Sequence, residues 1–202
     1  MSHCTNFKFQ YTDRKLIIQT FYNLGLKCED GIVCSYDSGY GKALGISSEE
    51  RPAIVAESNG FNYFMEDFGN HYELSIEKHN MSPADERTVK RMGKEFQKQY
   101  IKYTAQQVMK QMELNGQSCL LKENSDGFEI KFGLMYEKSL LVKLQNGRVN
   151  ERVRGVKGQS CQSITEALEN MLSSADVELN TEWTEEYYEA DDETFKIYNI
   201  NA

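Results

Sequence analysis

Cys161 is the side chain best placed for chemistry in this sequence. It follows Gly158-Gln159-Ser160 at the start of a predicted helix, where free backbone N–H groups and the helix dipole stabilise a thiolate. A nucleophilic cysteine also needs a base, and the histidines His3, His71 and His79 all lie far from Cys161 in the sequence. Two interpretations remain: a small buried residue at a loop–helix junction, which is the commoner case, or a catalytic or redox thiol.

Metal and nucleotide motifs are incomplete. The five cysteines include no C-x-x-C pair, although structural zinc sites usually pair their ligands two to four residues apart. Their odd number and the lack of a secretion signal favour reduced thiols. Gly39-Tyr40-Gly41-Lys42 lacks the P-loop spacing and is followed by Ala43 instead of Ser or Thr. We therefore expect no metal, no cofactor and no catalytic residue beyond the weak candidate Cys161.

A basic ridge runs along the predicted long helix, which covers about residues 84–115. Val89, Phe96 and Tyr100 belong to its apolar stripe, which is typical of core packing. On a neighbouring face, basic side chains recur at intervals of three and four: Arg87, Arg91, Lys94, Lys98 and Lys102. Such a face is usually only solvated. The alternative is a binding site for phosphate, nucleic acid or an acidic segment.

The C-terminal segment carries the negative charge of the chain. Between residues 176 and 193 there are nine acidic residues and no basic one, and the whole chain has a net charge of −8. The rest of the chain is therefore close to neutral. A solvated acidic tail is the usual interpretation, but Trp183, Tyr187 and Tyr188 are too apolar for one. We expect part of this segment to dock on the protein itself or on a partner.

Short periodic segments predict an α+β fold with mostly antiparallel sheets. A strand at 5–11 leads to a helix at 14–24 that Asp13 caps. Four strand-like runs then predict an antiparallel meander: 32–36, 53–56, 62–65 and 72–76. After the long helix come two predicted hairpins and one helix: 118–132 with Asp126-Gly127 at its turn, 140–153 with Asn146-Gly147 at its turn, and a helix whose buried stripe is Ile164, Leu168, Met171 and Leu172.

The same pattern predicts three parts. They are an N-terminal α+β domain at 1–133, a hairpin–helix domain at 134–175, and the acidic, aromatic-bearing segment at 176–202. Tandem ferredoxin-like units would fit this order of elements. Hydrophobic residues make up 40% and charged residues 27% of the chain, which is a globular composition. No window approaches the roughly 20 apolar residues of a membrane helix, and no signal peptide is recognisable, so we expect a cytoplasmic protein.

Two family resemblances cover most of the chain. The first half resembles domain of unknown function 1257, of the chloroplast and cyanobacterial open-reading-frame type. The residues that carry this resemblance are Met1-Ser2-His3, Gly39-Tyr40-Gly41, Tyr72-Glu73-Leu74, Gln99-Tyr100 with Tyr103, and Asp126-Gly127. Residues 138–190 resemble domain of unknown function 2997. The matching residues there are Gly147-Arg148-Val149, the run from Gly155 to Cys161, and Glu185-Glu186-Tyr187-Tyr188.

These resemblances imply a natural fusion of two families that are usually separate neighbouring genes. They imply no established activity. Such genes often lie beside ferredoxin-like or AAA-type ATPase genes, so the resemblance makes an AAA-type ATPase or a redox protein the expected partner. This is an association and not a mechanism.

We favour a non-catalytic accessory or adaptor protein that binds a protein partner through its C-terminal segment. Two alternatives stay open. One is a thiol enzyme or redox protein that uses Cys161. The other is a nucleic-acid binder that uses the basic ridge, although the net charge of −8 argues against it unless the acidic segment is displaced. The sequence leaves the oligomeric state open.

Overall fold

The computed structural model describes residues 3–35, 49–76, 81–158 and 160–188. Within them the fold is α+β, with both sheets antiparallel throughout, as the sequence predicts. The chain forms two compact units. The six-stranded unit combines the residues up to Thr12 with those from Lys98 onward, and the four-stranded unit covers Asp13–Gln97.

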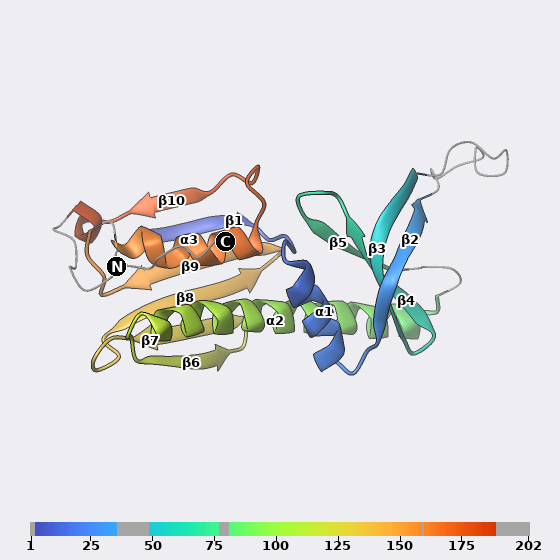
Figure 1. The fold of residues 1–202 in the computed structure, drawn as a ribbon, viewed down its shortest axis with the longest axis horizontal. Helices are drawn as coiled ribbons and strands as arrows, with labels where there is room; N and C mark the ends of the chain where they lie inside the picture. Colours follow the sequence, from blue (N-terminus) through green and yellow to red (C-terminus); the bar gives the residue numbers. More distant parts are fainter. Residues whose placement is uncertain (1–2, 36–48, 77–80, 159, 189–202) are drawn as a thin grey trace. The chain divides into compact units, whose positions relative to one another are not determined.

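The six-stranded unit is one sheet with the order β10-β1-β9-β8-β7-β6 (Figure 1). Its strands are β1 (His3–Lys8), β6 (Cys119–Asn124), β7 (Gly127–Phe132), β8 (Lys138–Gln145), β9 (Arg148–Arg154) and β10 (Asn180–Trp183). Its helical segments are the part of α2 (Pro83–Leu114) that follows Gln97, α3 (Ser160–Leu172) and the short 3-10 helix η2 (Glu185–Tyr188). No described helix of the chain is long and apolar enough to cross a membrane.

Strand alternation sorts this sheet into two faces. Both helices lie over the same face, which we call the inner face (Figure 1). Its side chains include Phe7, Ile130 and Val149, each 0% exposed. The helices contribute the other half of this core: Tyr100, Ile101, Ala105, Val108 and Met112 from α2, and Cys161, Ile164, Leu168 and Leu172 from α3. Of the predicted stripe of α3, only Met171 is not fully buried.

The two hairpins differ in how well the sequence locates their turns. In the β8–β9 hairpin, Gln145 pairs with Arg148, so Asn146-Gly147 forms the predicted two-residue loop, with φ values of 52° and 72°. In the β6–β7 hairpin, Asn124 pairs with Gly127. The loop is therefore Ser125-Asp126, one residue earlier than the predicted Asp126-Gly127. Gly127 is instead required inside the strand, because a Cβ there would lie 1.9 Å from the carbonyl oxygen of Val142.

The four-stranded unit confirms the predicted helix and meander. Helix α1 (Arg14–Asn23) starts at Asp13, whose carboxylate accepts hydrogen bonds from the backbone N–H groups of Lys15 and Leu16 at 2.8 and 3.1 Å. The strands then follow in chain order: β2 (Cys28–Ser35), β3 (Glu49–Ser58), β4 (Phe61–Asp67) and β5 (Tyr72–Ile76). The rings of Phe21 and Phe96, 4.5 Å apart, join α1 to the first half of α2.

The units divide at different places from the predicted domains. The predicted boundary near 134 falls between β7 and β8, which pair from Gly127 with Lys143 to Phe132 with Lys138, so the sheet continues across it. The structure divides instead after Thr12 and before Lys98. The predicted acidic segment, 176–202, also joins this sheet through β10. The predicted boundaries were wrong because β1 lies between β9 and β10. This pairing joins residues far apart in the sequence, and local periodicity cannot predict it.

Glu151 is an exception on the inner face. It lies on β9 opposite Thr5 of β1 and Val142 of β8, its side chain is 0% exposed, and neither carboxylate oxygen has a hydrogen-bond partner within the described residues. Burial raises the pKa of Glu151 well above its usual value, and the negative charge of Glu169 on α3 adds to this effect. Folding therefore favours the protonated form of Glu151.

This arrangement predicts a pH-dependent stability that Glu151→Gln removes. Because the folded-state pKa is raised, the contribution is complete below the usual glutamate pKa of 4.5 and is lost as the pH rises toward the folded-state value. In urea unfolding, the wild type should lose up to about 1.4 kcal/mol per pH unit in this window relative to the variant. The matched control is Glu129→Gln on the opposite face of the sheet, which should keep the wild-type slope. Equal slopes for wild type and Glu151→Gln would contradict the account.

Candidate binding surfaces

Cys161 lies in the core, in the first turn of α3. Its side chain is 0% exposed, and its Sγ donates a hydrogen bond to the carbonyl oxygen of Gly158 at 3.1 Å. No histidine side chain is described in the six-stranded unit, which contains Cys161, because the side chain of His3 lies outside the described part of the chain. His71 belongs to the other unit, and His79 lies outside the described residues. This placement favours the structural interpretation of Cys161, because a nucleophile must reach its substrate.

The other titratable groups that the structure describes include no candidate metal centre. Within the described residues, no three side chains of the types His, Cys, Asp and Glu gather closely enough to hold a metal ion. Burial, together with the charge of Glu113, raises the pKa of the Cys119 thiol to about 11. Burial also raises the pKa of Cys28. Both thiols are therefore held in their protonated, less reactive form.

The basic ridge is divided between the two units. Arg87, Arg91 and Lys94 are exposed residues of the four-stranded unit. Lys98, which is exposed, and Lys102, which is half-buried, belong to the six-stranded unit. Lys102 forms an ion pair with Glu123 of β6, and this hydrogen bond lowers the pKa of that carboxyl. The last side chain of the ridge is thus engaged within the protein.

The C-terminal aromatic residues form a cluster at the edge of the sheet. Trp183 ends β10 opposite His3 of β1, and its ring centroid lies 4.0 Å from that of Tyr187. Tyr188 packs edge-on against Tyr187 with centroids 5.3 Å apart. Trp183 is 38% exposed and Tyr188 77% exposed. The described part of the acidic segment therefore docks as a strand and still presents aromatic surface. The remainder, 189–202, lies outside the described residues.

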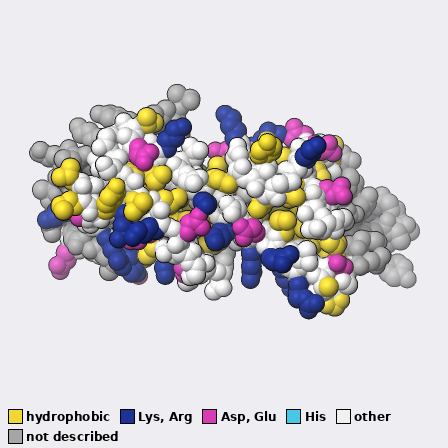
Figure 2. Space-filling model, turned by 90° about the horizontal axis from the view of Figure 1, so that it is seen from below, with side chains coloured by type: hydrophobic (Ala, Val, Ile, Leu, Met, Phe, Trp, Pro, Cys, Tyr) yellow, Lys and Arg dark blue, Asp and Glu magenta, His cyan; other side chains and the backbone are white. Residues whose placement is uncertain are grey.

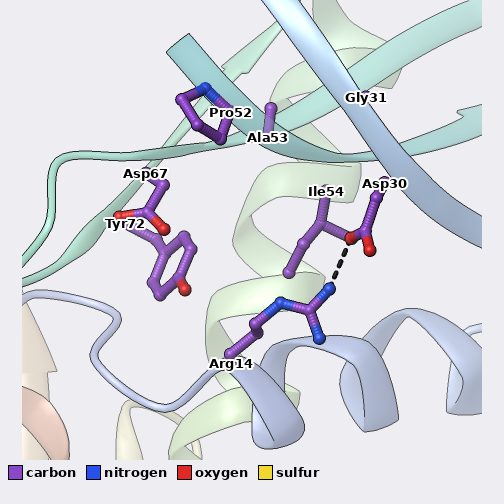
Figure 3. Close-up of a pocket in the computed structure, with 8 residues that line it drawn as sticks. All are labelled: Arg14, Asp30, Gly31, Pro52, Ala53, Ile54, Asp67 and Tyr72. Atoms are coloured by element: carbon purple, nitrogen blue, oxygen red, sulfur yellow. Dashed lines mark hydrogen bonds and ion pairs between the residues drawn. The ribbon is translucent and has the colours of Figure 1, made fainter.

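A small pocket of about 230 Å³, lined by both polar and apolar residues, lies in the four-stranded unit (Figure 3). Arg14 reaches from α1 toward Asp30 of β2 and forms an ion pair with it. Tyr72 and Asp67 line the pocket from the β4–β5 side. Burial and the neighbouring Asp67 carboxylate raise the pKa of Tyr72, so its hydroxyl stays protonated. The pocket is smaller than most ligand pockets, which span about 300–1,000 Å³.

The face opposite the helices, which we call the outer face, is the main feature that sequence analysis missed. Strand alternation and register place seven basic side chains on it within the described residues, against two acidic ones. The basic residues are Lys8 on β1, Lys122 on β6, Lys131 on β7, Lys143 on β8, and Arg148, Arg152 and Arg154 on β9. The acidic ones are Glu129 on β7 and Glu182 on β10.

Hydrogen bonds order part of the outer face. The Nε of Arg148 donates to Oδ1 of Asn6, and the amide of Asn6 donates in turn to Oδ1 of Asn150. Lys143 lies 3.5 Å from a carboxylate oxygen of Asp126 in the β6–β7 turn. In the view from below, Lys and Arg side chains lie across the described surface, interspersed with acidic and apolar side chains (Figure 2).

A hollow of about 390 Å³ adjoins one end of the outer face. Its lining includes Lys8 and Arg148, but also Asp176 and Glu178 from the segment that leads into β10. Basic and acidic side chains are therefore mixed there. The hollow offers no uniform charge to a ligand and is a weaker candidate than the open face beside it.

A sequence signal for the outer face does exist. Arg148, Arg152 and Arg154 are spaced by even numbers of residues, so on one strand they share a face. Their alignment with Lys131 and Lys143 depends on the register of two strand pairs, β7 with β8 and β8 with β9, which the sequence does not display.

The burial of Cys161 predicts slow alkylation. In the native protein, iodoacetamide should modify the half-buried Cys4 before Cys161, and peptide mapping by mass spectrometry would show the order. In denaturant, both thiols should react at similar rates, which provides the control. Faster labelling of Cys161 than of Cys4 in the native state, with a thiol pKa below the usual value of about 8.5, would restore the thiol-enzyme alternative.

Comparison with known proteins finds a family that resembles the C-terminal part of the chain. Residues 143–188 match a family model described as a protein of unknown function, DUF2997. This range covers the last three residues of β8, together with β9, α3, β10 and η2, and it confirms that part of the predicted resemblance. The resemblance of the first half to DUF1257 stays a prediction. No curated protein and no solved structure matches the chain. The segment from 143 to 188 is thus similar to a family whose function is itself unknown.

Proposed function

We propose that this chain is a non-catalytic accessory protein that binds another protein through its C-terminal segment. The observation that carries the proposal is the edge formed by β10. Within the described residues, β10 pairs with β1 on one side and with no strand on the other. An open edge offers backbone N–H and C=O groups to an added strand.

The aromatic cluster beside this edge supplies the second element of a protein-binding site. Tyr and Trp are enriched among the residues that dominate binding energy at protein interfaces, and Trp183, Tyr187 and Tyr188 lie together directly after β10. Glu182 and Glu185 are exposed within the same segment. The partner segment that fits this surface is extended and carries basic residues. An AAA-type ATPase or a redox protein remains the proposed class of partner.

The proposal includes the fusion of a DUF1257-like and a DUF2997-like segment. Strands from the two segments alternate in one sheet, because β1 lies between β9 and β10. This arrangement supports a common function of the two segments, since neither could form this sheet alone.

Affinity capture from the organism's own cells tests the proposal. The baits are the full chain, a chain that ends at Tyr188, and Tyr188→Ala. The matched control is Tyr22→Ala, because Tyr22 is 73% exposed but lies on α1 of the other unit. We expect the first two baits and the control to capture the same partner, and Tyr188→Ala to bind it roughly 5- to 30-fold more weakly, as for an interface aromatic. A partner held equally by all four would contradict binding at β10.

A further inference from the structure

We propose that the outer face of the six-stranded sheet binds the phosphate backbone of a nucleic-acid duplex. The first argument is charge. The strands of its described part carry seven basic and two acidic side chains. Basic residues outnumber acidic ones even when the three acids at its margin, Asp126, Asp176 and Glu178, are included, whereas the whole chain has a net charge of −8. A positive surface on an acidic protein attracts polyanions locally and sets the orientation of their approach.

The composition of the face favours nucleic acid over an acidic protein. Protein–protein interfaces have centres depleted of charged residues and enriched in aromatic ones. In its described part, the outer face carries only Leu120 and Leu141 as large apolar side chains, and no aromatic one. Polar and strongly positive surfaces are instead typical of interfaces with nucleic acids.

The absence of aromatic side chains on the described outer face also favours a duplex. Proteins that bind single strands stack the bases on aromatic rings, and a face without such rings offers unpaired bases no stacking surface. Three of the basic residues are arginines, whose planar guanidinium group can bind a phosphate with two hydrogen bonds. Arg148 is held in place through Asn6. Binding through the backbone alone is independent of sequence and strongly dependent on salt.

This surface differs from the basic ridge of α2, because the part of α2 that follows Gln97 covers the inner face (Figure 1) and the rest belongs to the other unit. The two surfaces can therefore be tested against each other. Lys131 and Arg152 lie on the outer face, on β7 and β9, with β8 between them. Arg87 and Arg91 lie on α2 and are exposed. Replacing both with Glu changes the net charge of the protein by the same amount as replacing Lys131 and Arg152 with Glu.

The experiment measures binding of fluorescent DNA and RNA duplexes of arbitrary sequence by anisotropy, over a range of salt concentrations. The proteins are the full chain, the chain that ends at Tyr188, Lys131→Glu with Arg152→Glu, and Arg87→Glu with Arg91→Glu. The variant Arg152→Gln is a milder change in case charge reversal disturbs the fold, which circular dichroism would show. A single strand and polyglutamate serve as competitors.

We expect the outer-face double variant to bind at least tenfold more weakly, Arg152→Gln a few-fold more weakly, and the ridge variant as the wild type does. The dependence of binding on salt should also flatten in the outer-face variants, by a slope of about 0.9 for each phosphate that is no longer neutralised. Binding seen only in the chain that ends at Tyr188 also supports the site. Three results would overturn the proposal: no binding by either chain at low salt, loss of binding in the ridge variant alone, or competition by the single strand or polyglutamate as strong as by the duplex.

Discussion

The pairing of β1 on both of its edges is the interaction on which the six-stranded unit depends. β1 comes from the beginning of the chain and lies between β9 and β10, which come from its end. Phe7 of β1 is fully buried, and the hydroxyl oxygen of Thr5 lies 3.1 Å from that of Thr181 on β10. Without this strand, β9 would be an edge and β10 would have no neighbour. The core, the outer face and the aromatic cluster of this unit therefore all depend on the pairing of β1 with β9 and β10.

Because successive side chains point to opposite faces of the sheet, a strand can contribute to both the core and the outer face. On β9, Val149 and Val153 fill the core, while Arg152 and its basic neighbours face away from the helices. The core and the candidate nucleic-acid surface are therefore separate in space although they interleave in sequence. A substitution on one face can change binding while the other face keeps the fold. Glu151 is the position where a titratable group lies on the core side, and its burial links stability to pH.

Local features of the fold were predictable from the sequence, and long-range ones were not. The cap at Asp13, the Asn146-Gly147 turn and the long helix each depend on residues a few positions apart. The sheet order depends on partners at opposite ends of the chain. For this reason the sequence predicted that part of the segment around Trp183 docks, but not that it does so as a strand of the sheet. The same holds for the candidate binding surfaces. The basic ridge could be predicted from helical spacing, whereas the outer face is formed by the register of several strands, which the sequence does not show.

Residue-resolved hydrogen exchange tests the position of β1 most directly. In a strand with two neighbours every backbone N–H is hydrogen-bonded, whereas in an edge strand only alternate ones are. We expect continuous protection of the amides from Cys4 to Phe7 and alternating protection in β10, measured by NMR on the full chain. Alternating protection within β1, with fast exchange throughout Asn180–Trp183, would contradict the pairing and with it the arrangement of both proposed binding surfaces.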